Sequence, residues 1–233
     1  PALLDALGST VGLLAAGFGF ACAAGILLGL AMGYHRPTYA LLEPTLELLG
    51  PVPKPALLPP LILLLGLGAP MKVAIVFLGA FFPVLINTVE GVRTVDPVLV
   101  DVARTFRRGT LRTLFRVILP ASLPMILAGM RVSLGLGLIL VTLAEVLTGT
   151  DGLGAQLVDA QRACRVQDMY AWTVVLAVLG LALALSFDAR ARRLIFWSSK
   201  RGSKPFGEGP ANENAARIAR RCGIGGSRAR AGE

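Results

Sequence analysis

The chain is a series of long apolar stretches separated by short polar ones. The first, from Val11 to Gly33, carries no charged side chain. As a helix it would extend about 35 Å, which exceeds the roughly 30 Å thickness of a bilayer's hydrocarbon core. Within it, Gly25 and Gly29 precede Gly33 at steps of four residues, a pattern that lets a neighbouring helix approach closely. We expect a transmembrane helix here.

Four further apolar stretches predict four more spans. They are Pro55–Met71, Val73–Val89, Val117–Thr150 and Met169–Phe187. Pro59 and Pro60 interrupt the first of these, so we expect a kinked or tilted helix there, followed by a turn at 66–70. The sequence therefore predicts an all-α polytopic transmembrane bundle of about five spans, within a membrane domain over residues 1–198. The preceding segment, 39–50, contains two glutamates and should lie at an interface or inside the bundle.

Charge gives this bundle an orientation. The net charge is +9, and its basic residues gather in the loop 90–120 and after Phe187. Cytoplasmic loops of membrane proteins carry the excess of Lys and Arg, so both regions should be cytoplasmic and Pro1 should lie on the outer side. We therefore expect a multi-pass membrane protein with a cytoplasmic C-terminus. The lipid bilayer, and not nucleic acid, is the partner that this charge indicates.

The two ends of the chain carry separate expectations. Residues 199–233 are rich in Gly, Arg, Ala and Asn, and cannot bury enough apolar surface to fold alone. We expect a disordered cytoplasmic tail, either inert or attracted to anionic headgroups. At the other end the chain opens at Pro1 without an initiator Met, which leaves room for a further N-terminal span.

The sequence shows no catalytic, cofactor-binding or metal-binding pattern. None of its four lysines follows a Gly, as a P-loop requires, and His35 is the single histidine. No serine has the Gly neighbours of a nucleophile elbow. We therefore expect a protein that is not an enzyme and that takes its energy from a gradient or from another subunit.

The loop 90–120 contains two amphipathic patterns. Leu99, Val102, Ala103 and Phe106 recur at helical spacing, and Leu111, Leu114, Phe115 and Ile118 repeat that spacing. Gly109 can end the first helix, Thr110 can cap the second, and Pro120 marks the approach to the next span. Two such helices suit a groove on a partner protein or the headgroup region of the membrane, and periodicity alone does not decide between them.

The order of residues in this loop resembles that of the permeases of binding-protein-dependent ABC importers, in particular the nitrate, sulfonate and taurine group. That family carries a cytoplasmic Glu-Ala-Ala motif, then a Gly, then an apolar-Leu-Pro ending. Here the corresponding residues read Asp101-Val102-Ala103, Arg107 and Ile118-Leu119-Pro120. Arg107 stands where the family has Gly, and Gly109 is the alternative source of the turn. Further matching pieces are Phe81-Phe82-Pro83, Asp96-Pro97, Pro124, Gly129-Met130-Arg131, Ala144-Glu145 and Gly152-Leu153-Gly154.

The resemblance implies a location in the bacterial cytoplasmic (inner) membrane, a function and a set of partners. Two copies of the permease would enclose a path for a small solute, an anion such as nitrate, a sulfonate or taurine. Separate ABC ATPase subunits would bind ATP and magnesium, and an extracytoplasmic solute-binding protein would deliver the solute. The resemblance also implies which residues of the coupling loop dock on the ATPase: Leu99, Asp101, Val102, Ala103, Phe106, Arg107, Gly109 and Pro120.

The sequence leaves open two alternative functions and the roles of two charged residues in the apolar stretches. A secondary transporter would work without an ATPase, and a membrane scaffold would transport nothing. Arg131 and Glu145 are costly in lipid and should face protein or water. They lie 14 residues apart, about 21 Å along a helix, so they cannot pair directly. Glu145 would line the path or brace its outer gate, or else form a buried structural hydrogen bond.

Overall fold

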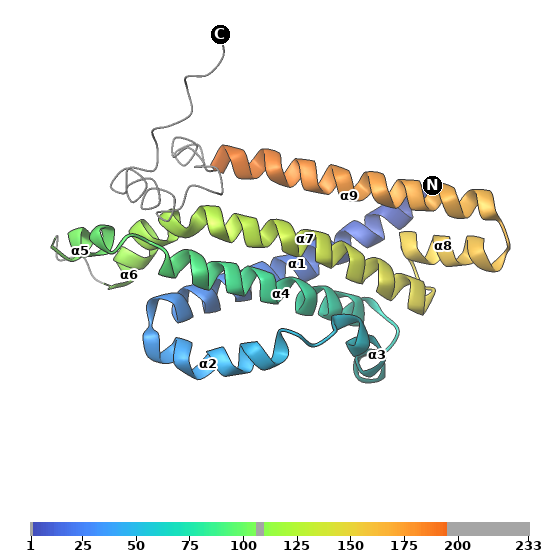
Figure 1. The fold of residues 1–233 in the computed structure, drawn as a ribbon. Helices are drawn as coiled ribbons and strands as arrows, with labels where there is room; N and C mark the ends of the chain where they lie inside the picture. Colours follow the sequence, from blue (N-terminus) through green and yellow to red (C-terminus); the bar gives the residue numbers. More distant parts are fainter. Residues whose placement is uncertain (1, 106–109, 195–233) are drawn as a thin grey trace, which may run out of the picture. The chain divides into compact units, whose positions relative to one another are not determined.

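The computed structural model describes residues 2–105 and 110–194, and every regular element within them is helical (Figure 1). The predicted tail, 199–233, lies outside the described residues. The elements are α1 (Ala2–Tyr34), α2 (Arg36–Leu49), the 3₁₀ turn η1 (Lys54–Leu57), α3 (Leu58–Leu65), α4 (Ala69–Arg93), α5 (Pro97–Thr105), α6 (Thr110–Thr113), the π-helix η2 (Leu114–Ile118), α7 (Leu119–Thr148), α8 (Leu153–Arg162) and α9 (Val166–Leu194).

Four stretches of helix are long and apolar enough to cross a membrane. They are Leu3–Tyr34, Ala69–Arg93, Leu114–Thr148 and Val166–Leu194. A fifth crossing is made if α2 and the helix Lys54–Leu65 count together, although these two meet at an angle of 86°. The prediction of an all-helical bundle with about five spans is confirmed.

The second crossing differs in form from the single kinked helix predicted over Pro55–Met71. Its apolar residues end at Leu65, and the crossing also uses α2, which lies before the proline cluster. Pro51, Pro53 and Pro55 lack the N–H that a continuing helix needs, so the helix stops and restarts at a new angle. Gly66, with φ of 75°, then ends α3 before the turn into α4.

Helices α1 and α4 run parallel in close contact (Figure 1). A Cβ added to Gly25 would lie 3.0 Å from Val84, and one added to Gly29 would lie 2.6 Å from Thr88. Gly33 meets Val92 in the same way, one turn further along both helices. The glycine stripe predicted to admit a neighbour therefore receives the β-branched side chains of α4, and we call this contact the glycine seam.

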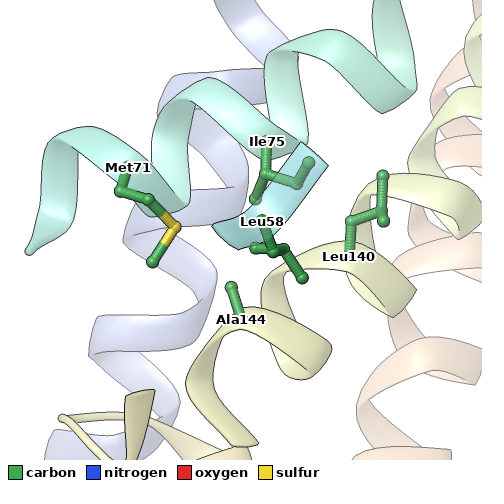
Figure 2. Packing of buried hydrophobic residues seen from close by; sticks show 5 residues of the cluster. All are labelled: Leu58, Met71, Ile75, Leu140 and Ala144. Carbon is green, nitrogen blue, oxygen red and sulfur yellow. The ribbon is translucent and has the colours of Figure 1, made fainter. Parts of the chain in front are cut away.

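Helix α7 packs antiparallel against α4 and also contacts α1. Gly79 of α4 faces Leu140, and at the opposite end of the helix Gly91 faces Met125. Figure 2 shows the cluster that closes this packing near the start of α4, where Leu58 of α3 inserts between the two long helices. Its buried members are Leu58, Met71, Ile75, Leu140 and Ala144. Helix α4 is thus the centre of the bundle, with α1, α3 and α7 around it.

The helices of the bundle meet at two ends, which differ in the elements that form them. The end of α4, all of α5 and α6, and the start of α7 meet at one end, which we call the loop end (Figure 1). The start of α4, the end of α7 and α8 meet at the other, which we call the α8 end. Helix α9 runs antiparallel to α7, because Gly180 faces Leu138 while Asp188 reaches Arg131.

Candidate functional site

Helix α5 stands at the loop end with apolar side chains turned to solvent. Its first turn is held by Asp96, whose carboxylate accepts a hydrogen bond from the backbone N–H of Val98 at 2.9 Å. Leu99 is 46% exposed and Val102 is 49% exposed, and Val98 is exposed as well. Exposed apolar groups on a short helix are available either to a partner protein or to the headgroup region of the membrane. We call Val98, Leu99 and Val102 the α5 surface.

The other predicted docking residues are placed as follows. Asp101 is exposed on α5 and also borders a cavity beneath it. Ala103 belongs to α5, but its side chain is not among those described. Phe106, Arg107 and Gly109 lie outside the described residues. The choice between Arg107 and Gly109 as the source of the turn therefore stays a prediction.

The second amphipathic helix is not the separate element that the sequence predicts. Helix α6 continues through η2 directly into α7, and Pro120 is the second residue of α7. Proline is tolerated near a helix start, and its clash with the carbonyl four residues earlier is relieved where the turn widens to a π-helix. The apolar pattern of this segment divides in two: Ile118 packs into the bundle with Leu30 and Val92, whereas Phe115 is 52% exposed.

At the α8 end, Glu145 is fully buried and joins three helices. Its carboxylate accepts a hydrogen bond from the Thr10 hydroxyl of α1 at 2.8 Å and from the Gly154 N–H of α8 at 3.0 Å. The Thr10 oxygen in turn accepts the N–H of Leu153 at 3.0 Å. These are the first N–H groups of α8, which its own residues do not cap. Glu145 and Thr10 thus supply the cap of α8 from α7 and α1, and we call this set the α8 cap.

Two glycines make the α8 cap fit. A Cβ on Gly152 would lie 2.1 Å from the Glu145 carboxyl carbon, and φ at this residue is +130°, so any side chain would be both blocked and strained. A Cβ on Gly154 would lie 2.6 Å from the Thr142 carbonyl oxygen. The Gly-Leu-Gly run eight residues after Ala144-Glu145 is therefore explained by close approach of the α8 backbone to a buried carboxylate.

Lys72 completes this end of the bundle from α4. Its side chain is buried, and its ammonium donates hydrogen bonds to the Thr150 carbonyl at 3.2 Å and the Asp151 carbonyl at 2.8 Å. It is also close enough to attract the Glu145 carboxylate. In the sequence Lys72 is a single basic residue between two apolar stretches, and Thr10 has no distinguishing neighbours. The hydrogen bonds of Lys72 and Thr10 to distant residues become visible only when the contacts between helices are known.

Arg131 pairs with Asp188 across α7 and α9. The two side chains are 3.0 Å apart, with Arg131 61% exposed and Asp188 24% exposed. Helix α9 buries none of the residues in its apolar span, so this pair is one of the specific contacts that hold it. Arg131 and Glu145 do not contact each other, as their spacing along α7 predicts.

Replacing Arg131 with Asp is expected to destabilise the protein by about 1–2 kcal/mol, the range of polar contacts between membrane helices, because repulsion replaces the attraction to Asp188. The charge-swapped double variant, Arg131→Asp with Asp188→Arg, should recover most of the loss. Thermal unfolding of the purified protein in detergent measures both. A double variant no more stable than the single one would contradict a role for the ion pair.

Two cavities lie in the half of the bundle that is nearer to the loop end. One, of about 910 Å³, lies between α2 and α4, and we call it the α2–α4 cavity. The other, of about 680 Å³, reaches beneath α5 to Asp101. Met32, Tyr39 and Arg93 border both, with the Arg93 guanidinium 4.1 Å from the centre of the Tyr39 ring. Among the described residues no cluster of His, Cys, Asp and Glu is arranged to hold a metal ion.

The fold defines a helical protein whose long apolar helices can cross a membrane several times. The chain belongs to the family of binding-protein-dependent transport system inner membrane components, whose model matches residues 23–196. It is thus a multi-pass inner-membrane protein, and the resemblance seen in its sequence is confirmed.

Curated relatives support this assignment over most of the chain. A Bacillus subtilis (strain 168) protein named as the aliphatic sulfonates transport permease SsuC is 35% identical, covering 78% of this chain and 66% of the relative. The taurine transport system permease protein TauC of Escherichia coli (strain K12) is 34% identical, covering 74% and 63%. The chain therefore spans a little under two thirds of the length of these two relatives.

A solved structure shares the fold. The inward-facing MetNI methionine ABC transporter contains a chain that superposes with a TM-score of 0.70, covering 82% of this chain and 95% of that one. The sequence identity is 17%, so this likeness shows the arrangement of helices and nothing about the solute.

Proposed function

We propose that this chain is the membrane-spanning permease subunit of an ATP-driven importer, and that its loop end docks on separate ATPase subunits in the cytoplasm. Two copies would enclose the path, ATP and magnesium would bind to the ATPase subunits, and an extracytoplasmic binding protein would deliver a small solute. The solute would belong to the sulfonate, taurine or nitrate kind. Family membership and the relatives named for sulfonate and taurine transport support the proposal.

The observation that carries the docking role is the exposed α5 surface. Leu99 and Val102 are exposed on a nine-residue helix that is too short to cross a membrane and that stands beside polar Asp96 and Asp101. A partner with an apolar groove would cover them. Ala103, Phe106, Arg107 and Gly109 continue this surface in the proposal, and Pro120 belongs to α7, the helix that follows the loop.

The charges at the two ends support a cytoplasmic loop end and C-terminus. Arg residues of α4, α6, η2 and the end of α9 gather at the loop end, whereas the α8 end carries Lys72, Arg162 and Arg165 among acidic neighbours. The positive-inside rule then places the loop end in the cytoplasm. In this orientation the α8 cap braces the outer end of the permease through Glu145, and Arg131 holds α9 against α7.

Leu99→Asp and Val102→Asp are expected to release the ATPase subunit, because each places a charge in an interface that must exclude water. Each should lower the amount of ATPase that co-purifies with the permease by at least about tenfold, a loss of roughly 1.4 kcal/mol. Val166→Asp is the matched control, since Val166 is an exposed valine at the opposite end of the bundle. Equal recovery of ATPase with all variants would overturn the docking role.

A further inference from the structure

The continuous helix formed by α6, η2 and α7 exposes a basic and aromatic face near its start. Arg112, Phe115 and Arg116 are all exposed, and Phe115 lies between the two arginines. Residues three and four positions apart are neighbours on a helix surface, with Cβ atoms about 5–6 Å apart. The opposite face is buried, because Thr113 and Ile118 are each 3% exposed. We call Arg112, Phe115 and Arg116 the η2 face.

The two arginines of the η2 face have no acidic partner. Among the residues that the structure describes, neither Arg112 nor Arg116 forms an ion pair. The sequence contains no Asp or Glu between Asp101 and Glu145, so α6, η2 and most of α7 carry no negative side chain. Phe115 adds a large apolar ring that is 52% exposed. The η2 face is therefore complementary to a partner that is both anionic and apolar.

The surface of a phospholipid bilayer has both of these properties. Anionic headgroups attract Arg and Lys that lie beside a membrane span. Arg side chains near the end of a span can also reach the headgroups while their stems cover apolar surface. The η2 face is placed for such contacts, because Ile118 behind it packs with Leu30 and Val92, close to the ends of two membrane-spanning helices.

Helix α5, the other amphipathic helix of the same loop, carries acidic side chains instead. Its described charged residue is Asp101, and Asp96 caps its first turn, whereas the side chain of Arg104 is outside those described. Anionic headgroups repel carboxylates, so the α5 surface suits a groove on a protein better than a lipid surface. The two amphipathic patterns, which periodicity alone does not separate, thus differ in the partner that they fit.

We propose that the η2 face binds anionic phospholipids, with Arg112 and Arg116 on the headgroup phosphates and Phe115 beside the start of the acyl chains. The inference goes beyond the proposed function, because it needs neither the ATPase nor the solute. Since α5 contacts both α6 and η2, a lipid held here also fixes the position of the α5 surface relative to the membrane.

A tryptophan at position 115 reports lipid contact directly. Phe115→Trp is made in a background in which Trp172 and Trp197 are replaced by Phe. The purified permease is placed in phosphatidylcholine nanodiscs that contain equal amounts of either brominated phosphatidylglycerol or brominated phosphatidylcholine, because bromine quenches Trp fluorescence at short range. Quenching should show a preference for phosphatidylglycerol of at least about fivefold. The same reporter on α5, Val98→Trp, should show no such preference.

The combined substitutions Arg112→Gln and Arg116→Gln should abolish the preference at position 115. Arg162→Gln is the matched control and should leave it unchanged, since Arg162 is an exposed arginine at the α8 end. Equal quenching by the two lipids, no quenching by either, or the same preference at Val98→Trp would overturn the proposal. Loss of quenching at position 115 when the ATPase binds would also overturn it, because the η2 face would then belong to a protein interface.

Discussion

Glu145→Ala is expected to lower the stability of the purified permease by about 3–5 kcal/mol, the usual cost of removing one member of a buried charged network. The substitution leaves the Thr10 hydroxyl and the Gly154 N–H without their acceptor, and it leaves the buried Lys72 without the nearby negative charge. It also uncaps α8. The measurement is the midpoint of thermal unfolding in detergent.

Three further variants separate the α8 cap from general damage to the core. Glu145→Gln keeps an acceptor and should lie between wild type and Glu145→Ala. Thr10→Val removes the hydroxyl that links Glu145 to Leu153 and should cost about 1–3 kcal/mol. Thr173→Val is the control, because that exposed hydroxyl bonds only within its own helix. A Glu145→Ala protein as stable as wild type would show that the cap contributes nothing.

Gly29→Leu is expected to prevent correct assembly of the bundle. The first atom of any side chain at Gly29 meets Thr88 at 2.6 Å, and the α4 backbone lies immediately behind it. The helices must separate, which opens the glycine seam along its length. Gly29→Ala, with only that first atom, should fold but lose about 1–3 kcal/mol. Size-exclusion profiles and unfolding midpoints measure the two effects.

Gly19→Leu is the matched control on the same helix. A Cβ at Gly19 has no neighbouring atom within 4 Å, so a side chain there enters open space. Because Gly is a poor helix former, Gly19→Ala should be neutral or slightly stabilising. If Gly19 and Gly29 variants lost stability equally, close packing at the seam would not be the reason for the glycines.

Hydropathy and charge predicted the long spans because those features are local. Four of the apolar stretches between Val11 and Phe187 correspond to the helices α1, α4, α7 and α9. The glycine stripe was also visible, since helical spacing makes a face from the sequence alone. What the stripe could not show was its partner, the β-branched face of α4.

The structure differs from the sequence-based predictions at prolines and at contacts between residues far apart in the chain. The prolines at 51, 53 and 55 divide the second crossing into two helices, and hydropathy alone assigned it only the apolar part after Pro55. Pro120 predicts a boundary between two helices. In the structure the π-helix η2 leads directly into α7, so the helix continues past Pro120. The α8 cap depends on contacts between residues 135 and 143 positions apart, which no local pattern encodes.

The contact between the α5 surface and the ATPase can be measured directly by photocrosslinking. A benzophenone amino acid at Val102 should crosslink to the ATPase subunit when the two are co-expressed, and the same group at Val166 should not. Crosslinks from Val102 only to lipid, or to the ATPase from Val166 instead, would contradict the proposal that this exposed helix connects the permease to its source of energy.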